Sequence, residues 1–256
     1  MDNYSVSGCI VTYNNKRTIN DTLKTIFEFT KDIDFKLYVV DNGSTDGTVE
    51  LIKENYPQIN LIQTGENIGF GKGHNHIIDE LDSKYHFIIN PDIILCDNVI
   101  RKIAEYFENN SDAGIVSPKI CFPDGRLQIL GKRNPKLKYL VASRLRNDEQ
   151  PGQVLSEYAM LETGLDKEMD IEVASGCFLG IRTDLFRQIG GFDDRYFMYF
   201  EDFDLSRCIN KISKVRYYPE AVIYHEWGRD SKRNTKLKMI HISSMFKYFL
   251  KWALKK

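Results

Sequence analysis

Three carboxylates, Glu201, Asp202 and Asp204, stand among aromatic side chains in the segment YFMYFEDFDLS (196–206). Because apolar surroundings disfavour an ionised carboxylate, they raise its affinity for a proton. A carboxylate held in this way suits general-base chemistry, in which it takes a proton from a weakly acidic hydroxyl group. The same composition is also typical of the first turn of a helix, where acidic side chains are favoured and neighbouring rings form core. The segment alone leaves both interpretations open.

Another acidic residue, Asp41, ends the apolar run KLYVVD and precedes the turn NGSTDG (42–47). A carboxylate at the end of a buried strand can accept a hydrogen bond from an N–H group of a pyrimidine base. Gly43 would let the backbone approach such a ligand closely. The alternative is turn chemistry alone, with a side chain of the turn capping the next helix.

A candidate metal ligand, Asp92, follows the apolar strand YHFII in the sequence INPDIIL. It would present one hard oxygen to Mg²⁺ or Mn²⁺ beside a diphosphate, and the substrate's phosphates would complete the coordination. His225, after the apolar run AVIY, could add an imidazole. In the alternative interpretation Asn-Pro-Asp only ends a strand and the histidine is structural.

A glycine-rich turn, NIGFGKGHN (67–75), opens a predicted helix, and bare backbone amides at a helix N-terminus suit a phosphate group. It matches neither the dinucleotide fingerprint, which needs glycine at His74, nor a P-loop, which needs glycine at Phe70. We expect His74 and His76 on the helix surface. No nucleophile motif accompanies these residues, so a base, a metal site and a phosphate cradle suit displacement of a nucleoside diphosphate by an activated hydroxyl.

The elements that must position these residues alternate along the first half of the chain. Four apolar runs are each followed by a polar turn and by apolar residues at helical spacing: SGCIVTY, KLYVVD, INLIQT and YHFIIN. This order predicts an α/β fold with a mainly parallel central sheet flanked by helices. Ligands of such sheets bind beyond the carboxyl ends of the strands, where the polar residues stand.

The second half is less regular. Residues 123–170 are basic and interrupted by proline and glycine, which predicts a long excursion from the sheet. The segment DIEVASGCFLGIRTDLFRQIGG (170–191) predicts a strand and then a helix that the glycines end. From Ser231 onward lysines and apolar residues alternate at helical spacing without any acidic residue, which predicts a basic amphipathic helix. It would lie either in the headgroup layer of an anionic membrane or on the domain.

The bulk composition excludes several classes. The 256 residues carry a formal net charge of -1, so no basic field indicates nucleic acid as a partner. Five scattered cysteines without a C-x-x-C pair predict reduced thiols in a cytoplasmic protein. Neither a signal peptide nor a membrane-spanning run is recognisable.

The ordered motifs resemble family 2 glycosyltransferases of the GT-A (Rossmann-like) fold, and most closely the bacterial rhamnosyltransferases of O-antigen and cell-wall polysaccharide assembly. The resemblance rests on IVTYNN (10–15), VVDNGSTDGT (39–48), NIGFGKGHN (67–75), NPD (90–92), ASGCFLGIR (174–182), YFMYFEDFDLS (196–206) and H-x-x-G-x-x-S (225–231). It implies one transferase domain over residues 1–230, with a nucleotide-sugar half (1–120) and an acceptor half (121–230), and a helical tail (231–256).

The same resemblance assigns a donor pocket. Thr12 and Asp41 would hold the base and its ribose, and Tyr13 and Asn14 would line that pocket. The wall beside the donor would be shaped by Asn67, Gly69 and Gly71, and the floor under the transferred sugar by Gly176 and Cys177.

It also assigns the reacting groups. Asp202 would be the general base, and Glu201 would orient it or bind the acceptor. Asp92 matches the second aspartate of the family's Asp-x-Asp metal motif, while Asn90 replaces the first, which puts metal dependence in question. His225 would contact the metal, Mg²⁺ or Mn²⁺, or the diphosphate.

The function implied is inverting transfer of L-rhamnose from dTDP-rhamnose to a saccharide or lipid-linked acceptor, in the cytoplasm or on the cytoplasmic face of the membrane. Alternatives are a UDP-sugar donor on the same fold, or a member that binds sugar nucleotides without turnover. A sugar-1-phosphate nucleotidyltransferase would need a glycine-rich loop where VTYNNKRT contains no glycine. The sequence does not predict the acceptor, the linkage or the oligomeric state.

Overall fold

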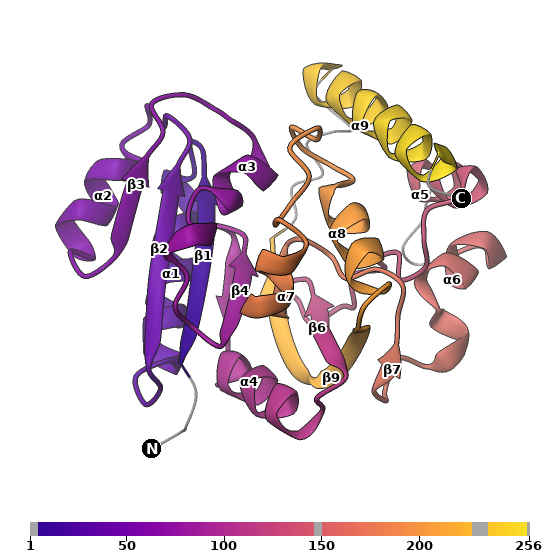
Figure 1. Ribbon diagram of the computed structural model, residues 1–256, viewed down its shortest axis with the longest axis horizontal. Helices are drawn as coiled ribbons and strands as arrows, with labels where there is room; N and C mark the ends of the chain where they lie inside the picture. Colours follow the sequence, from indigo (N-terminus) through magenta and orange to yellow (C-terminus); the bar gives the residue numbers. More distant parts are fainter. Residues whose placement is uncertain (1–4, 146–149, 227–234, 255–256) are drawn as a thin grey trace.

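The computed structural model describes residues 5–145, 150–226 and 235–254, which form one mixed β-sheet with helices on both faces (Figure 1). The strands are β1 (Val6–Thr12), β2 (Phe35–Asp41), β3 (Asn60–Gln63), β4 (Tyr85–Ile89), β5 (Ile93–Leu95), β6 (Ala113–Cys121), β7 (Met169–Asp170), β8 (Phe178–Arg182) and β9 (Lys214–His225). The helices are α1 (Lys16–Phe29), α2 (Thr48–Asn55), α3 (Phe70–Asn75), α4 (Val99–Asn109), α5 (Leu137–Arg144), α6 (Gln153–Ala159), α7 (Thr183–Gln188), α8 (Glu201–Ile209) and α9 (Thr235–Leu254), with short 3₁₀ turns at Ile78–Glu80 and Leu161–Thr163.

The sheet has the strand order β3-β2-β1-β4-β8-β6-β9-β5, with β7 paired to β9. The run β3-β2-β1-β4 is parallel, as predicted, so the carboxyl ends of these strands meet at one edge. β8 is antiparallel to both β4 and β6, and therefore begins at the edge where β4 ends. β9 runs parallel to β6 and brings its last residue, His225, beside Ile93 of β5.

Two apolar layers enclose the sheet, and consecutive strand residues alternate between them because side chains along a strand point to opposite faces. Ile10 belongs to the layer that α1 and α4 cover, with Leu23 and Ile103. Val11 belongs to the opposite layer, under α7 and α8. This two-sided burial explains the nearly continuous apolar runs of the central strands.

The chain leaves the sheet at residue 123, as predicted, forms α5 and α6 around a small apolar cluster that includes Tyr139 and Tyr158, and returns to the sheet at β7, the end of the predicted segment 123–170. The strand expected from residue 170 onward is present only as β7 and β8, with 171–177 as the segment between them. The surface position expected for His74 is wrong: its side chain is buried, with its ring against Phe70, and burial lowers its pKa well below the usual value.

The predicted C-terminal helix is α9, which lies beside α8 on the right of Figure 1. Tyr248 and Trp252 pack its inner side against Tyr196 and Phe200. Within the described ranges, no helix combines the length and the apolar character needed to span a bilayer.

Candidate active site

A cavity of about 460 Å³ opens at the edge where β1, β4 and β9 end and β8 begins. It brings together residues that lie up to 226 positions apart in the chain. The cavity is lined by Val11, Thr12, Tyr13, Asn15, Asn42, Asn67, Gly69, Phe70, Asn90, Pro91, Asp92, Leu130, Ser175, Gly176, Cys177, Met198, Tyr199, Glu201, Asp202, His225 and Leu237. Most of the predicted site residues are in this set. Asn14, Asp41 and Gly71 are not among the lining residues.

Asp41 ends β2 next to Thr12, its partner in the parallel register with β1. The carboxylate is 2% exposed, and its Oδ2 accepts hydrogen bonds from the N–H groups of Gly43 (3.1 Å) and Ser44 (3.0 Å). Its other oxygen, Oδ1, is buried and has no partner among the described residues. A buried carboxylate oxygen without a donor is costly, so this atom is suited to a ligand that brings its own N–H or O–H group.

Asn14 joins two loops. Its Oδ1 accepts from the N–H of Thr45 and its own N–H donates to Ser44 Oγ, both at 2.8 Å. Its φ of 57° lies in the left-handed region, which asparagine tolerates better than most residues. Asn14 therefore shapes the loop, while the neighbouring Tyr13, with its side chain half exposed, stands at the mouth of the cavity.

The glycines of the turn before α3 permit close packing. A Cβ at Gly69, whose φ is +93°, would lie 2.3 Å from the carbonyl oxygen of Phe197. A Cβ at Gly71 would lie 2.9 Å from Cβ of Phe192. The side chain of Asn42 donates to the carbonyl oxygen of Gly69 at 3.0 Å. The turn therefore carries one wall of the cavity and fixes it to the segment before α8.

Asp92 and His225 face each other across the ends of β4 and β9, with Asp92 Oδ2 3.4 Å from His225 Nε2. Burial alone lowers the pKa of His225, but the neighbouring Cys177 and Asp92 outweigh it and raise that pKa to about 10. Gln128 holds the imidazole, its Oε1 lying 3.1 Å from Nδ1. Asp92 Oδ1 is buried and unpaired among the described residues.

Asp92 and His225 are the predicted metal ligands, and their surroundings test that prediction. The described residues contain no group of three His, Cys, Asp or Glu side chains that could hold a metal ion. One carboxylate oxygen without a partner and one imidazole fit a divalent cation that takes its remaining ligands from a diphosphate, provided that the cation displaces the proton that Asp92 and Cys177 favour on His225. Asn90 also lines this part of the cavity, and its backbone N–H donates to the carbonyl oxygen of Cys177 at 2.8 Å.

The two carboxylates predicted to react, Glu201 and Asp202, lie in the first turn of α8 and face the same cavity. Asp202 is partly exposed to the cavity; its Oδ2 accepts from the N–H of Gly176 (3.1 Å) and its Oδ1 from that of Phe203 (2.9 Å). Glu201 is buried, and its Oε2 has no partner among the described residues. Burial raises the pKa of both carboxyl groups, and for Glu201 the charge of Asp202 adds to the effect.

The backbone before these carboxylates is strained. Tyr199 and Phe200 have φ values of 69° and 70°, a region that costs aromatic residues of order 1–3 kcal/mol each. Tyr199 lines the cavity, whereas Phe200 turns away from it and is buried against α9. The ring of Phe200 is thus part of the core, as expected for the rings beside the first turn of a helix.

Asp204, the third carboxylate, points away from the cavity and contacts Lys251 and Trp252. For Asp204 the structure therefore favours a structural role in α8 over that of a second base. Sequence reasoning missed several lining residues: Asn15, Asn42, Phe70, Leu130, Ser175, Met198 and Leu237. Of these residues, Asn42 could have been predicted from the sequence, because it follows Asp41 in the same polar turn. Gly228 and Ser231 of the last motif lie outside the described residues.

Comparisons with known proteins identify the family of the chain. Residues 7–190 match the family model described as "Glycosyl transferase family 2". The N-acetylglucosaminyl-diphospho-decaprenol L-rhamnosyltransferase of Mycobacterium tuberculosis is 29% identical over 208 residues, which are 77% of this chain and 68% of that protein. The dTDP-rhamnosyl transferase RfbG of Shigella flexneri is 27% identical over 139 residues, 51% of this chain and 48% of that protein.

A similar solved structure is the mannosyltransferase PcManGT of Pyrobaculum calidifontis in complex with GDP-Man and Mn²⁺. It has a TM-score of 0.61 at 18% identity, over 88% of this chain and 58% of that chain, which shows a shared fold. The strand order, the cavity at the strand ends and the family match over most of the chain lead to one conclusion. The chain belongs to glycosyl transferase family 2, has the GT-A fold and is a glycosyltransferase.

Proposed function

We propose that this enzyme transfers L-rhamnose from dTDP-rhamnose to a hydroxyl group of a saccharide acceptor, with inversion at the anomeric carbon. One observation carries the chemistry: Glu201 and Asp202 face the same cavity as Asp92 and His225, with Asp202 partly exposed to it. This arrangement supports the proposal, because a displacement at a sugar nucleotide requires a base and a diphosphate site within one cavity.

The donor assignment is supported by Asp41 and by the relatives. Its buried Oδ1 has no partner among the described residues and is suited to accept the N3–H of thymine or uracil. Two of the similar proteins are named as rhamnosyltransferases, one of them as a dTDP-rhamnosyl transferase. The uracil of a UDP-sugar could donate to the same oxygen. The enzyme would therefore distinguish the two donors by its contacts with the deoxyribose and with the transferred sugar.

In the proposed reaction Asp202 takes the proton of the acceptor hydroxyl, and the resulting oxygen attacks the anomeric carbon. As the new C–O bond forms, the bond from that carbon to the diphosphate oxygen breaks, and dTDP leaves with the electron pair. A single displacement of this kind inverts the anomeric configuration. The N–H groups of Gly176 and Phe203 fix the orientation of Asp202 before the reaction.

Asp92 and His225 would hold a divalent cation against the diphosphate. Bound there, Mg²⁺ or Mn²⁺ would neutralise charge on the departing diphosphate. The protein residues provide the orientation: Gln128 fixes the imidazole, and the Asn90 N–H fixes the backbone at the cavity floor.

Two measurements test the proposal. In a thermal-shift panel of dTDP-rhamnose, dTDP-glucose, UDP-glucose and GDP-mannose, dTDP-rhamnose is expected to raise the Tm most. Asp202→Asn is expected to keep this shift and to lose dTDP release by at least about 100-fold, since it removes the base and retains the shape. Full turnover by Asp202→Asn would refute the assignment of Asp202 as the base. Selective stabilisation by a UDP-sugar would refute dTDP-rhamnose as the donor and assign a UDP-sugar instead. Stabilisation of the wild type without any dTDP release would instead indicate a binding protein.

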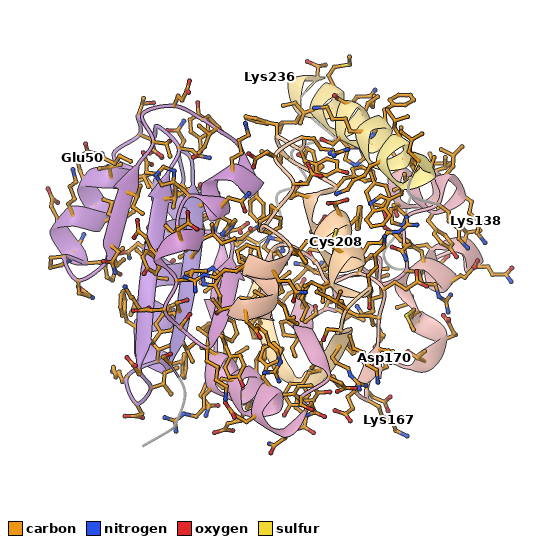
Figure 2. All side chains as sticks on the ribbon, viewed as in Figure 1. Glu50, Lys138, Lys167, Asp170, Cys208 and Lys236 are labelled. Carbon is orange, nitrogen blue, oxygen red and sulfur yellow. The ribbon has the colours of Figure 1, made fainter. Side chains whose placement is uncertain are left out.

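We further propose a lipid-linked acceptor and a position of the enzyme on the inner-membrane surface. The outer side of α9 exposes Phe246 (67%) and Leu250 (62%), and the adjoining α5 exposes Leu137 (67%). The helices adjoin because Leu140 of α5 packs on the cluster that holds Tyr248 of α9. Neither helix contains an acidic residue, and both contain exposed lysines, among them Lys138 of α5 and Lys236 of α9, which Figure 2 labels. Apolar side chains among cations suit an anionic lipid surface.

Vesicle flotation tests this position. The wild type is expected to float with vesicles that contain phosphatidylglycerol and less with phosphatidylcholine alone. Phe246→Asp/Leu250→Asp should abolish flotation, whereas Ile212→Asp, at an exposed apolar residue in the turn before β9, should not. Equal flotation of all three proteins would contradict the proposed surface.

A further inference from the structure

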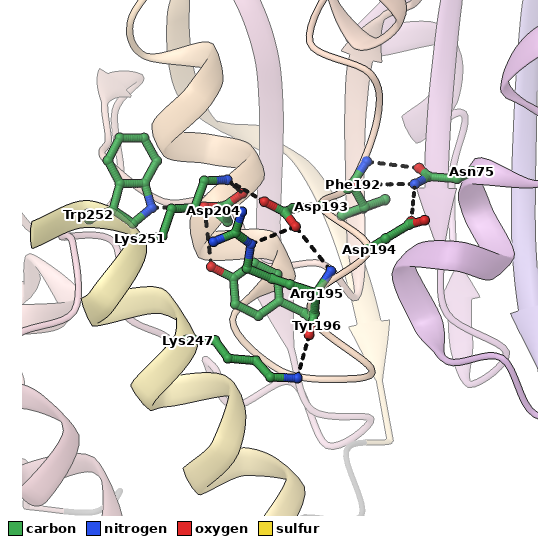
Figure 3. Close-up of polar contacts among 10 residues, drawn as sticks. All are labelled: Asn75, Phe192, Asp193, Asp194, Arg195, Tyr196, Asp204, Lys247, Lys251 and Trp252. Carbon is green, nitrogen blue, oxygen red and sulfur yellow. Dashed lines mark hydrogen bonds and ion pairs between the residues drawn. The ribbon is translucent and has the colours of Figure 1, made fainter. Parts of the chain in front are cut away.

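A buried cluster of charged side chains joins α9 to α8 (Figure 3). Asp204 is 2% exposed, and its Oδ2 lies 2.5 Å from Nζ of Lys251, which is 8% exposed. Its Oδ1 accepts from the indole N–H of Trp252 at 2.8 Å, and Lys251 donates also to Asp193 at 2.7 Å. Burial of charged groups is costly even when they are paired, so a packed apolar contact would hold two helices together with less penalty.

The cluster lies next to the reacting carboxylates along the chain. Asp204 follows Asp202 by two residues in α8, and both lie in the first turn of this helix. A contact that holds Asp204 therefore also holds the backbone of Asp202. Asp193, the second partner of Lys251, lies in the loop that leads to α8. Lys251 therefore bridges two points on either side of the segment that places Glu201 and Asp202.

The same helix also contacts the backbone of that loop. Ser244 Oγ donates to the carbonyl oxygen of Met198 at 2.8 Å, and Lys247 Nζ donates to that of Arg195 at 2.7 Å (Figure 3 shows the second contact). Directly after Met198 come Tyr199 and Phe200, the two aromatic residues with positive φ. Such backbone persists only where its surroundings hold it in place, and α9 supplies these surroundings.

Aromatic contacts hold the strained residues from the same side. The ring of Phe200 lies 5.5 Å from that of Tyr248 and 5.3 Å from that of His241, and the ring of Tyr199 lies 5.2 Å from His241. Every one of these partners belongs to α9. These contacts with α9 hold Phe200 away from the cavity. The side chains that follow it, Glu201 and Asp202, are thereby directed toward the cavity.

We propose that α9 is a positioning element for the catalytic carboxylates, and that Lys251 and Asp204 are its positioning residues. They touch neither the cavity nor a reacting atom; they hold α8 and the strained turn so that Asp202 meets the Gly176 N–H and faces the acceptor. The inference rests on the proposed transferase function. It adds that transfer depends on a contact between residues 47 positions apart, one of them in the C-terminal helix.

The test compares two variants that remove the contact between Lys251 and Asp204. One variant leaves a buried charge without its cation, and the other leaves no charge at this contact. Lys251→Met keeps an unbranched side chain of nearly the same length and leaves the charge of Asp204 without its cation, although the hydrogen bond from Trp252 remains. Asp204→Asn/Lys251→Met carries no net charge at the contact, and its amide oxygen can still accept from Trp252. Lys24→Met, an exposed lysine on α1, is the control. Both cluster variants are expected to lower kcat about tenfold or more with the donor KM within about threefold, measured well below the Tm. The control should not change either value.

A second readout does not require activity. Since the Gly176 N–H donates to Asp202, its hydrogen exchange reports the position of that carboxylate. We expect faster exchange at Gly176 and Phe203 in the cluster variants and unchanged exchange in β1. Wild-type kcat in the folded double variant, or unchanged exchange at Gly176 despite a lower Tm, would show a purely fold-stabilising contact and overturn the inference. Absence of turnover by the wild type would refute the proposed function instead, and the exchange measurement would still decide the positioning role.

Discussion

Asp41→Asn tests how the base of the donor is recognised. In the native chain Oδ2 accepts from Gly43 and Ser44, and Oδ1 is buried without a partner among the described residues. The amide of asparagine has the same shape. Its oxygen can take the place of Oδ2 and keep both backbone hydrogen bonds, which leaves its NH₂ group where the unpaired oxygen was. The variant should therefore fold normally and present a donor instead of an acceptor.

The size of the effect follows from this reversal. A hydrogen bond from an N–H group to a charged acceptor contributes about 1.5–3 kcal/mol, which corresponds to roughly a tenfold to 150-fold change in affinity. Because the new NH₂ group would face the N3–H of thymine or uracil, both donors, we expect a loss near the upper end. Cytosine carries an acceptor at N3, so CDP should lose less affinity than dTDP or UDP.

Isothermal titration of dTDP, UDP and CDP measures these affinities, and the Tm of the free protein reports folding. Asp46→Asn is the matched control in the same loop, because both oxygens of Asp46 already accept from backbone N–H groups, those of Lys16 and Thr48, and Asp46 does not line the cavity. It should lower the Tm and leave nucleotide affinity within about twofold. If Asp41→Asn bound dTDP and UDP as tightly as the wild type, Asp41 would not recognise the base.

Further predictions concern the carboxylates of α8. Burial, and then the charge of Asp202, raises the pKa of Glu201, so this group weakens folding as the pH rises from its unfolded-state pKa through its folded-state pKa. Glu201→Gln should therefore raise the Tm at about pH 8 and leave it nearly unchanged near about pH 3, where the carboxyl group is protonated in both states; calorimetry showing no gain at high pH would contradict this. Because burial also raises the pKa of Asp202, the acid limb of kcat should lie above the ordinary aspartate value of about 3.9 in a pH–rate profile. Gly176→Ala would place a Cβ 3.2 Å from Cβ of Asp202 and should lower kcat about tenfold at unchanged donor affinity, unlike Gly152→Ala, where nothing lies within 4 Å.

The parallel half of the fold could be predicted from the sequence because its signals are local. Each of β1, β2 and β4 is buried on both faces and reads as a continuous apolar run, and α1 and α4 show apolar residues at helical spacing. The pairing of β8 between β4 and β6 had no such signal. It depends on contacts between strands about 60 to 90 residues apart, which a local pattern does not encode.

The site was predictable where a strand end carries a polar residue, as for Thr12 and Asp92. It was not predictable where tertiary packing decides. Leu237 lines the cavity only because α9 folds back over α8, and His74 is buried only because Phe70 and Phe192 enclose it. The partner of Asp204 was equally hidden, since its sequence neighbours suggest no more than an acidic first turn.

The neighbouring carboxylates Glu201 and Asp202 differ in their hydrogen bonds, and this difference assigns their roles. Asp202 accepts two backbone N–H groups, which stabilise its ionised form, whereas Oε2 of Glu201 is buried without a partner among the described residues. Burial raises both pKa values, and the two N–H groups favour the negative charge on Asp202 rather than on Glu201. A protonated Glu201 can donate to the acceptor while the ionised Asp202 takes its proton. Glu201→Gln, which mimics the protonated acid, should then keep much more of kcat than Asp202→Asn; the reverse order would exchange the two roles.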